Sequence, residues 1–409
     1  MGTQALAAAS AVLPIHSLFV GVLTGFSLGA SLLLAQACGA GDTQKMQACA
    51  ENMTIVLAAV GFGCTALALG FGPALLSLTR TPAELLPDAV CYLRILAVGY
   101  FAQALYQFLA DALRALGDSR TPLWFLVFAA LLNIVLDAWF LAGLGLGVAG
   151  VGWATLIAEA VAAAGCLVYT AVRCPLLRVD LRRLHPDGHI LRALLHYGSA
   201  TALQQTIGSV GGMLQQTVVN GFGSAAIAAY NTAYKVDNLL LLPCIGLGSA
   251  LSLYTAQNLG AGQRARMQQG LRACVLVTAA FSAAASVGIF AGAKGLTLVF
   301  LRAADTAAVA ESMRGLRLLA PLYLLCNEIS LMTNFCKGAG RVSVAANVSI
   351  AQIVLRVAFA FGLAGTLGMD AVWLCMPVTW VVCSVFYGWY YWSGRWDSLA
   401  SAGERKLEE

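Results

Sequence analysis

An amide and a carboxylate stand four residues apart inside an apolar stretch of this sequence. Asn133 and Asp137 belong to the run 122–144, and a spacing of four puts both side chains on one face of a helix. A charged side chain at the centre of a bilayer costs at least about 2.5 to 3.5 kcal/mol, so it needs a partner or a purpose. This carboxylate can take up a proton or hold a small cation. The alternative is a structural hydrogen bond to Thr155 or Gln107.

A second polar group lies in the later half of the chain. Asn231 and Lys235 share one face of the run 226–256, whereas Asp237 is two residues further on and faces another way. We place Lys235 near mid-depth, where it needs a carboxylate partner. Glu328 is the natural candidate and Asp237 is the alternative. A fixed ion pair and a role in lining a cavity are both open for this group.

Glutamines make the run 192–219 unusually polar, which indicates that one stripe of it faces a watery cavity. Two other ionisable residues within apolar runs, Glu159 and Arg356, receive no role. We therefore predict an ion-coupling group and a group that lines a substrate cleft. The first consists of Asp137, Asn133, Thr155 and Gln107, and the second of Lys235, Asp237, Asn231, Glu328, Gln204 and Gln205.

The elements that position these side chains are membrane spans. The chain has 409 residues, of which 60% are hydrophobic and only 11% charged, and its mean hydropathy is +0.79. Such a composition excludes one or two soluble domains and predicts an all-α polytopic membrane protein. Runs of about 20 apolar residues predict eleven spans, near 11–37, 53–78, 90–111, 122–144, 149–172, 192–219, 226–256, 271–293, 315–335, 344–365 and 370–392.

An internal repeat organises these spans. The segment AQACGAGDTQKMQ at 35–47 returns 221 positions later as AQNLGAGQRARMQ at 256–268, and Leu93, Arg94 and Tyr100 recur at an offset of 223 as Leu316, Arg317 and Tyr323. A long repeat of spanning helices is typical of transporters built from two bundles. Nothing in the first copy corresponds to the run 192–219. We therefore expect five plus six helices here, from a plan of six plus six in which the first helix is missing.

The predicted domains follow from this repeat. The first lobe is 1–172, a cytoplasmic linker is 173–191, the second lobe is 192–392 and a cytoplasmic tail is 393–409. Of the 24 Lys and Arg residues, sixteen lie on the side of the linker and tail, six on the opposite side and two within spans. This positive-inside bias predicts a multi-pass membrane protein with a cytoplasmic linker and tail and with both copies in the same orientation.

Several classes of function are excluded by the residues. We find no D-D-x-x-D or H-E-x-x-H motif, so we expect no enzyme, no catalytic residue, no metal site and no cofactor other than a coupling ion. The twelve cysteines contain no C-x-x-C. The net charge of +5 reflects the positive-inside bias, and we expect membrane lipid and small molecules as partners, not nucleic acid. We expect a monomer.

The sequence also resembles a known family. The stretch LADALRALGDSRTPLWFLVFAALLNIVLDAWFLAGLGLGVAGVGWATLIA at 109–158 contains an R-x-L-G-D turn, then N-x-x-x-D, then G-x-x-G-x-x-x-A-T. It resembles the signature of the multidrug and toxic compound extrusion (MATE) family, and the stretch 222–268 is similar to the region between the seventh and eighth helices of its bacterial branch. The resemblance implies two lobes of six helices around a central cleft.

The resemblance also implies an activity. Such proteins export cationic or amphipathic compounds in exchange for protons or sodium ions. Asn133, Asp137 and Thr155 would match polar members of the family's first-lobe ion site, whereas its carboxylate on the first helix has no counterpart in this chain. The run 192–219 also lacks the acid that some sodium-coupled members carry, which favours protons over sodium.

We therefore expect an antiporter that works by alternating access. Two alternatives are a flippase of lipid-linked oligosaccharides and a truncated remnant without activity. The flippase would need several Arg or Lys in its cleft, and only Lys235 and Arg356 lie at depth.

Overall fold

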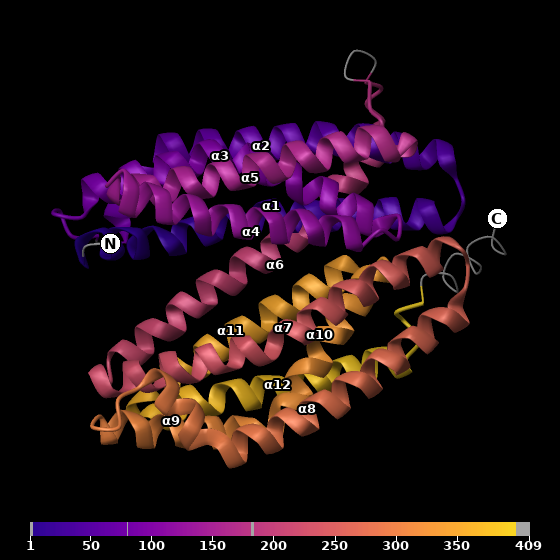
Figure 1. The fold of residues 1–409 in the computed structure, drawn as a ribbon. Helices are drawn as coiled ribbons and strands as arrows, with labels where there is room; N and C mark the ends of the chain where they lie inside the picture. The colour runs from indigo at the N-terminus through magenta and orange to yellow at the C-terminus, as the bar shows by residue number, and fades with distance from the viewer. Residues whose placement is uncertain (1–2, 80, 181–183, 398–409) are drawn as a thin grey trace. The chain divides into compact units, whose positions relative to one another are not determined.

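The computed structural model describes residues 3–79, 81–180 and 184–397, apart from the side chains of 3–6. The described residues form helices and turns and contain no strand. Figure 1 shows their course along the chain. The α-helices are α1 (Thr3–Gly39), α2 (Thr43–Leu78), α3 (Leu86–Ala115), α4 (Arg120–Ala138), α5 (Gly147–Arg173), α6 (Gly188–Asn220), α7 (Ser224–Gly260), α8 (Arg264–Phe300), α9 (Thr306–Leu319), α10 (Tyr323–Gly338), α11 (Val342–Leu367) and α12 (Met369–Trp392).

Three short elements interrupt or follow these helices. A π-helical turn, η1 (Trp139–Gly143), continues α4, a 3-10 turn, η2 (Pro175–Leu177), follows α5, and η3 (Ala320–Leu322) joins α9 to α10. The predicted span 315–335 is therefore an interrupted helix, because Pro321 in η3 has no N–H for the helical ladder.

Ten helical segments among the described residues are long and apolar enough to cross a membrane. They confirm ten of the eleven predicted spans and the all-α polytopic fold. The eleventh predicted span, 192–219, forms the helix α6 of 33 residues, but α6 is not among the ten, and its crossing of the membrane stays a prediction. Its glutamines and small polar residues make it less apolar than the ten.

Contacts divide the chain into two compact units, 1–206 and 207–409. The division falls inside α6 and not in the predicted linker 173–191. The reason is that the first half of α6 packs against α1: a Cβ on Gly25 would lie 2.3 Å from the Cα of Ala202, and one on Gly29 would lie 2.5 Å from the backbone carbon of Tyr197. Glycines at this spacing let two helix backbones meet. The lobe and linker boundaries stay predictions.

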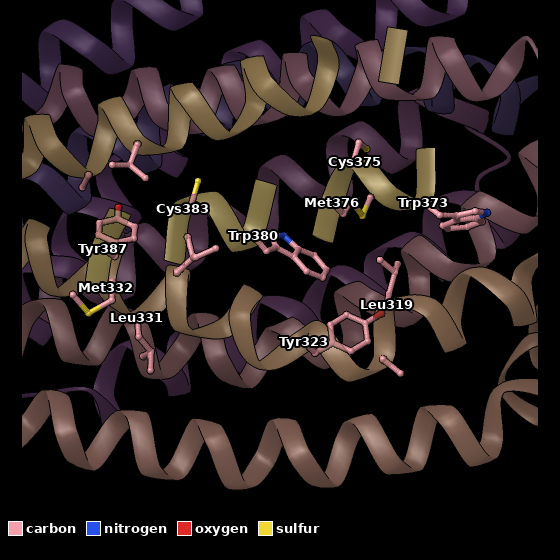
Figure 2. Packing of buried hydrophobic residues seen from close by; sticks show 14 of the residues in the cluster. Leu319, Tyr323, Leu331, Met332, Trp373, Cys375, Met376, Trp380, Cys383 and Tyr387 are labelled. Carbon is pink, nitrogen blue, oxygen red and sulfur yellow. The ribbon is translucent and has the colours of Figure 1, made fainter. Parts of the chain in front are cut away.

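In the first unit, α3 lies among its neighbours and contacts α1, α2, α4 and α5. Its buried side chains include Tyr92 and Tyr100, and Tyr100 is fully enclosed. In the second unit the core is aromatic: Trp373, Trp380 and Tyr387 of α12 pack with Tyr323 and its neighbours on α9 and α10, as Figure 2 shows. Burying such rings in each unit fixes the faces that its helices turn inward.

The duplication is visible in the turns. Gly41 and Gly262 both have φ 68°, Gly117 and Gly340 have φ 96° and 79°, and Gly147 and Gly368 both have φ 58°. The pairs are separated by 221, 223 and 221 positions. A positive φ is strained for residues with a Cβ, so matched glycines mark the same turn in both copies. The two units repeat one helical plan.

Candidate functional site

The hairpin of α4 and α5 carries the predicted ion-coupling face. The Asn133 side chain donates to Thr155 Oγ1 at 3.5 Å, and Thr155 donates in turn to the carbonyl of Val151 at 3.0 Å. The π-helical turn and the positive-φ glycines Gly145 and Gly147 close the hairpin beyond these residues. The structure therefore brings Asn133 and Thr155 together, as the alternative structural interpretation required.

Asp137 lies one turn beyond Asn133 on the same helix. Its side chain is half-buried, and its Oδ1 is buried with no hydrogen-bond partner in the described part of the chain. The Tyr92 phenol of α3 lies within electrostatic range. An unpartnered carboxylate oxygen in apolar surroundings disfavours the charged form, so this group is suited to binding a proton.

Gln107 lies apart from this face. Its amide donates to Asp111 Oδ2 at 3.2 Å, and Asp111 also accepts from the Ser27 hydroxyl and the Arg114 guanidinium, each at 2.6 Å. Asp111 is buried and belongs to a satisfied network near the C-terminal end of α3. Gln107 therefore supports this network, and the structure does not bring it to Asp137.

The four cleft residues predicted in the second unit separate. Asp237 is buried and accepts a hydrogen bond from the Tyr323 hydroxyl, whereas Asn231 and Lys235 are exposed on other faces of α7. The Lys235 ammonium lies over the ring of Phe300, the last residue of α8.

The predicted ion pair between Lys235 and Glu328 is wrong. Glu328 lines a pocket of about 660 Å³ together with Arg264, Gln268 and Arg272 from the first turns of α8. Phe300 lies at the other end of this helix, which has 37 residues and is about 55 Å long at 1.5 Å per residue. Counting residues along a span misplaced Lys235, which lies near one end of the unit.

Gln204 and Gln205 belong to the half of α6 that packs on α1. Gln205 is exposed, and its Cβ lies 3.5 Å from where a Cβ on Gly21 would be, while Gln204 is half-buried. Their place in a substrate cleft stays a prediction.

Sequence reasoning missed a pair of matched contacts, one in each unit. In the first, His16 Nδ1 and the Tyr100 hydroxyl are 3.2 Å apart and their rings are stacked at 5.7 Å. In the second, Tyr323 donates to Asp237. The offsets of 221 and 223 relate His16 to Asp237 and Tyr100 to Tyr323. The repeat already paired the tyrosines, and extending it to their partners would have predicted both contacts.

In the second unit, a positively charged side chain lies near the contact of Tyr323 with Asp237. The Arg356 guanidinium lies within electrostatic range of Asp237, and its buried Nε has no hydrogen-bond partner in the described chain. The ring centroids of Trp380 and Tyr323 are 6.1 Å apart. Asp237 is thereby held by a hydrogen bond and a nearby positive charge.

Outside the spans, one acidic residue is held in its charged form. Asp118, in the turn before α4, accepts from the backbone N–H of Arg120 and Thr121 at 3.1 and 3.0 Å and from the Tyr169 hydroxyl at 3.4 Å. Partial burial acts to raise the pKa of Asp118, but the bonds from Thr121, Arg120 and Tyr169 outweigh it and lower the pKa below 3.8. This turn fixes the start of the helix that carries Asn133 and Asp137.

The site residues that the structure describes are not grouped as metal ligands. Among the described residues, no three His, Cys, Asp or Glu side chains gather closely enough to hold a metal ion. The interior acids Asp137 and Glu159 lie on the α4 and α5 hairpin, and the described structure holds both in the first unit.

Comparison with known proteins finds relatives that match most of the chain. The chain is 26% identical to the probable multidrug resistance protein YpnP of Bacillus subtilis over 98% of its own length and 89% of the relative. It is 28% identical to an FAD transporter of Shewanella oneidensis over 66% of this chain and 61% of that protein. A crystal structure of MATE in the bent conformation matches with a TM-score of 0.91 and 23% identity, over 98% of this chain and 89% of that one.

A model of a protein family matches the chain in two stretches. Its description is MatE, and it covers residues 1–139 and 200–362. These stretches include Asn133 and Asp137 in the first and Asp237 and Tyr323 in the second. The chain therefore belongs to the MatE family, the multidrug and toxic compound extrusion transporters.

Proposed function

We propose that this protein exports cationic or amphipathic small molecules across the bacterial inner membrane in exchange for protons, and that Asp137 carries the coupling proton. The observation that carries the proposal is the buried, unpartnered Oδ1 of Asp137 beside the Asn133 and Thr155 pair. The names of relatives such as YpnP support multidrug substrates. The excess of Lys and Arg in the linker and tail supports a cytoplasmic location for both segments.

The cycle is alternating access. Protonation of Asp137 from the outer side removes its negative charge and lets it donate a hydrogen bond, which changes the hydrogen bonding of the hairpin around Asn133. The compound is then released outside. Loss of the proton to the cytoplasm restores the charge and the affinity for a cationic compound. Neutral or zwitterionic compounds would be bound by the apolar surface instead.

Everted membrane vesicles test this proposal. Vesicles that contain the full chain are energised to form a proton gradient, and ethidium is added while the interior pH is followed with a fluorescent dye. We expect ethidium to collapse the pH gradient with the wild-type chain. The rate should fall at least about tenfold for Asp137→Asn. Asp370→Asn, which changes an acid paired with Arg314 at the start of α12, is the control that keeps the rate.

Two other outcomes would overturn the proposal. Equal rates for the wild type and Asp137→Asn would remove the role of this carboxylate. Ethidium transport driven by an imposed sodium gradient, without a proton gradient, would mean that the coupling ion is sodium and not a proton. Because one relative is an FAD transporter, FAD serves as the anionic probe, and transport of FAD without transport of ethidium would overturn the preference for cations.

A further inference from the structure

A second carboxylate in the first unit has no assigned role. Glu159 lies on α5, one turn beyond Thr155, and is half-buried. Its Oε2 lies 3.6 Å from where a Cβ on Gly99 of α3 would be, so the side chain points at α3 and not at lipid. It makes no hydrogen bond or ion pair with any residue whose position is described. Counting about 1.5 Å per residue, it lies about 21 Å from the C-terminal end of α5.

The groups around Glu159 include two tyrosines, one of which contacts a histidine. The carboxylate lies within electrostatic range of the phenols of Tyr92 and Tyr100. Tyr100 in turn contacts His16 of α1 through its hydroxyl, at 3.2 Å from Nδ1. The titratable groups that face this region from the packed helices are His16 on α1, Cys64 on α2, Tyr92 and Tyr100 on α3 and Asp137 on α4. No cation other than a protonated His16 is among them.

In the second unit, an acid stands at the position that corresponds to His16. The offsets relate His16, Tyr100 and Glu159 to Asp237, Tyr323 and Trp380, and the latter three are in mutual contact through Tyr323. The acid there stands on α7, with a hydroxyl donor and Arg356 nearby. In the first unit the acid has moved to α5, and histidine stands opposite the tyrosine. The tyrosine of the first unit therefore contacts a base and lies within electrostatic range of an acid.

Three properties follow from this geometry. Glu159 is carried at mid-depth without a fixed cation, so its charged form has little to stabilise it and it gains a proton readily. Tyr100 can accept a proton at its oxygen while its own passes to His16 Nδ1, because a hydroxyl both donates and accepts. The His16 imidazole can take up a proton at one ring nitrogen and release one from the other. No bond other than those to the moving protons forms or breaks.

We propose that Glu159 is a second proton-exchanging carboxylate of this transporter, connected through Tyr100 to His16. The proposal rests on the proposed function and adds a proton to each transport cycle. Asp137 and Glu159 then flank the Asn133 and Thr155 pair along the hairpin, with Tyr92 within electrostatic range of both acids. The first unit thereby couples two protonations to one rearrangement.

Labelling of the wild-type chain tests the proposal without any transport assay. Dicyclohexylcarbodiimide reacts with protonated carboxyls in apolar surroundings, and mass spectrometry of the purified protein locates the adduct. We expect an adduct on Glu159 that decreases as the pH rises. In Tyr100→Phe the midpoint should move to higher pH, because the surroundings of the carboxylate lose a polar hydroxyl group. An adduct that does not depend on pH, no adduct, or an unmoved midpoint in Tyr100→Phe would overturn the proposal.

A count of protons separates this proposal from the proposed function. Proteoliposomes with a fixed pH gradient are brought to a steady state with ethidium, and the concentration ratio gives the number of protons per compound. We expect Glu159→Gln to exchange one proton fewer than the wild type while it still binds ethidium, and Asp370→Asn to match the wild type. An unchanged count in Glu159→Gln overturns the role of Glu159 and leaves the proposed function intact. A wild type that ignores the pH gradient overturns the function, whereas pH-dependent labelling of Glu159 reports on the carboxylate alone.

Discussion

The two units place acids differently in one repeated frame. In the first unit, Asp137 leaves a buried oxygen without a partner and Glu159 has no hydrogen bond or ion pair with a described residue. In the second unit, Asp237 accepts from Tyr323 and has the positive charge of Arg356 nearby. A charge inside apolar helices must be held by partners or removed by a proton. We therefore expect the second unit to hold Asp237 in place and the acids of the first unit to exchange protons.

The comparison extends to helix packing, where we expect the largest effect. Gly25 of α1 and Gly246 of α7 are counterparts at an offset of 221. A Cβ on Gly25 would lie 2.3 Å from the backbone of Ala202, whereas one on Gly246 would have no described atom within 4 Å. Gly25→Ala should therefore cost about 3 kcal/mol, because two backbones must separate. Gly246→Ala should be neutral or stabilising by up to about 1 kcal/mol, from helix propensity.

Thermal unfolding of both variants in the same detergent measures this difference. A loss of stability of similar size in both would mean that the two copies pack these helices alike, and would remove this part of the comparison.

The second largest expected effect is the change in stability when an interior aspartate is removed. Asp237→Ala should cost about 1.5 to 3 kcal/mol, because it removes the acceptor of a buried hydrogen bond to a charged group. Asp137→Ala should leave stability unchanged or raise it, because it removes an unpartnered buried oxygen. Chemical or thermal unfolding in detergent provides both values. If Asp137→Ala proved to be the more destabilising of the two, the assignment of fixed and titrating acids would be reversed.

The smallest effect concerns the turn before α4. Hydrogen bonds from Thr121, Arg120 and Tyr169 outweigh burial and lower the pKa of Asp118 below 3.8. A lowered pKa in the folded state stabilises the fold above the unfolded value, and this contribution disappears as the pH falls below about 5. Asp118→Asn should therefore flatten the acid side of the stability profile. The matched position in the second copy is Arg341, so Arg341→Gln should leave the acid side as it is. An unchanged profile in Asp118→Asn would mean that the turn contributes nothing that depends on pH.

Much of the fold could be predicted from the sequence, because hydropathy and an offset need no knowledge of which helix faces which. The ten confirmed spans and the repeat have this basis. The contact of Asn133 with Thr155 could be predicted because a short hairpin places α4 beside α5.

The wrong predictions concerned the position of a side chain along its helix and the neighbour that the side chain faces. A residue count gives the height of a side chain along one helix but not the neighbour that it faces, and for Lys235 even the height was wrong, since the residue lies over Phe300 at the end of α8. Gln107 and Asp137 lie on different helices, and only the packed structure shows that Gln107 faces Asp111. The contact of His16 with Tyr100 joins residues 84 positions apart, and periodicity within a helix carries no signal for it.

The π-helical turn that follows Asp137 also records how the two copies diverged. Between the matched glycines, the first copy runs from Gly117 to Gly147 and the second from Gly340 to Gly368, so the first is longer by two residues. The wide turn Trp139–Gly143 lies inside this interval, and the corresponding α11 is regular. Such a turn takes up an inserted residue without breaking the helix. The π-helical turn therefore takes up extra length of the first copy beyond Asp137, and the helix that carries Asn133 and Asp137 on one face stays unbroken before it.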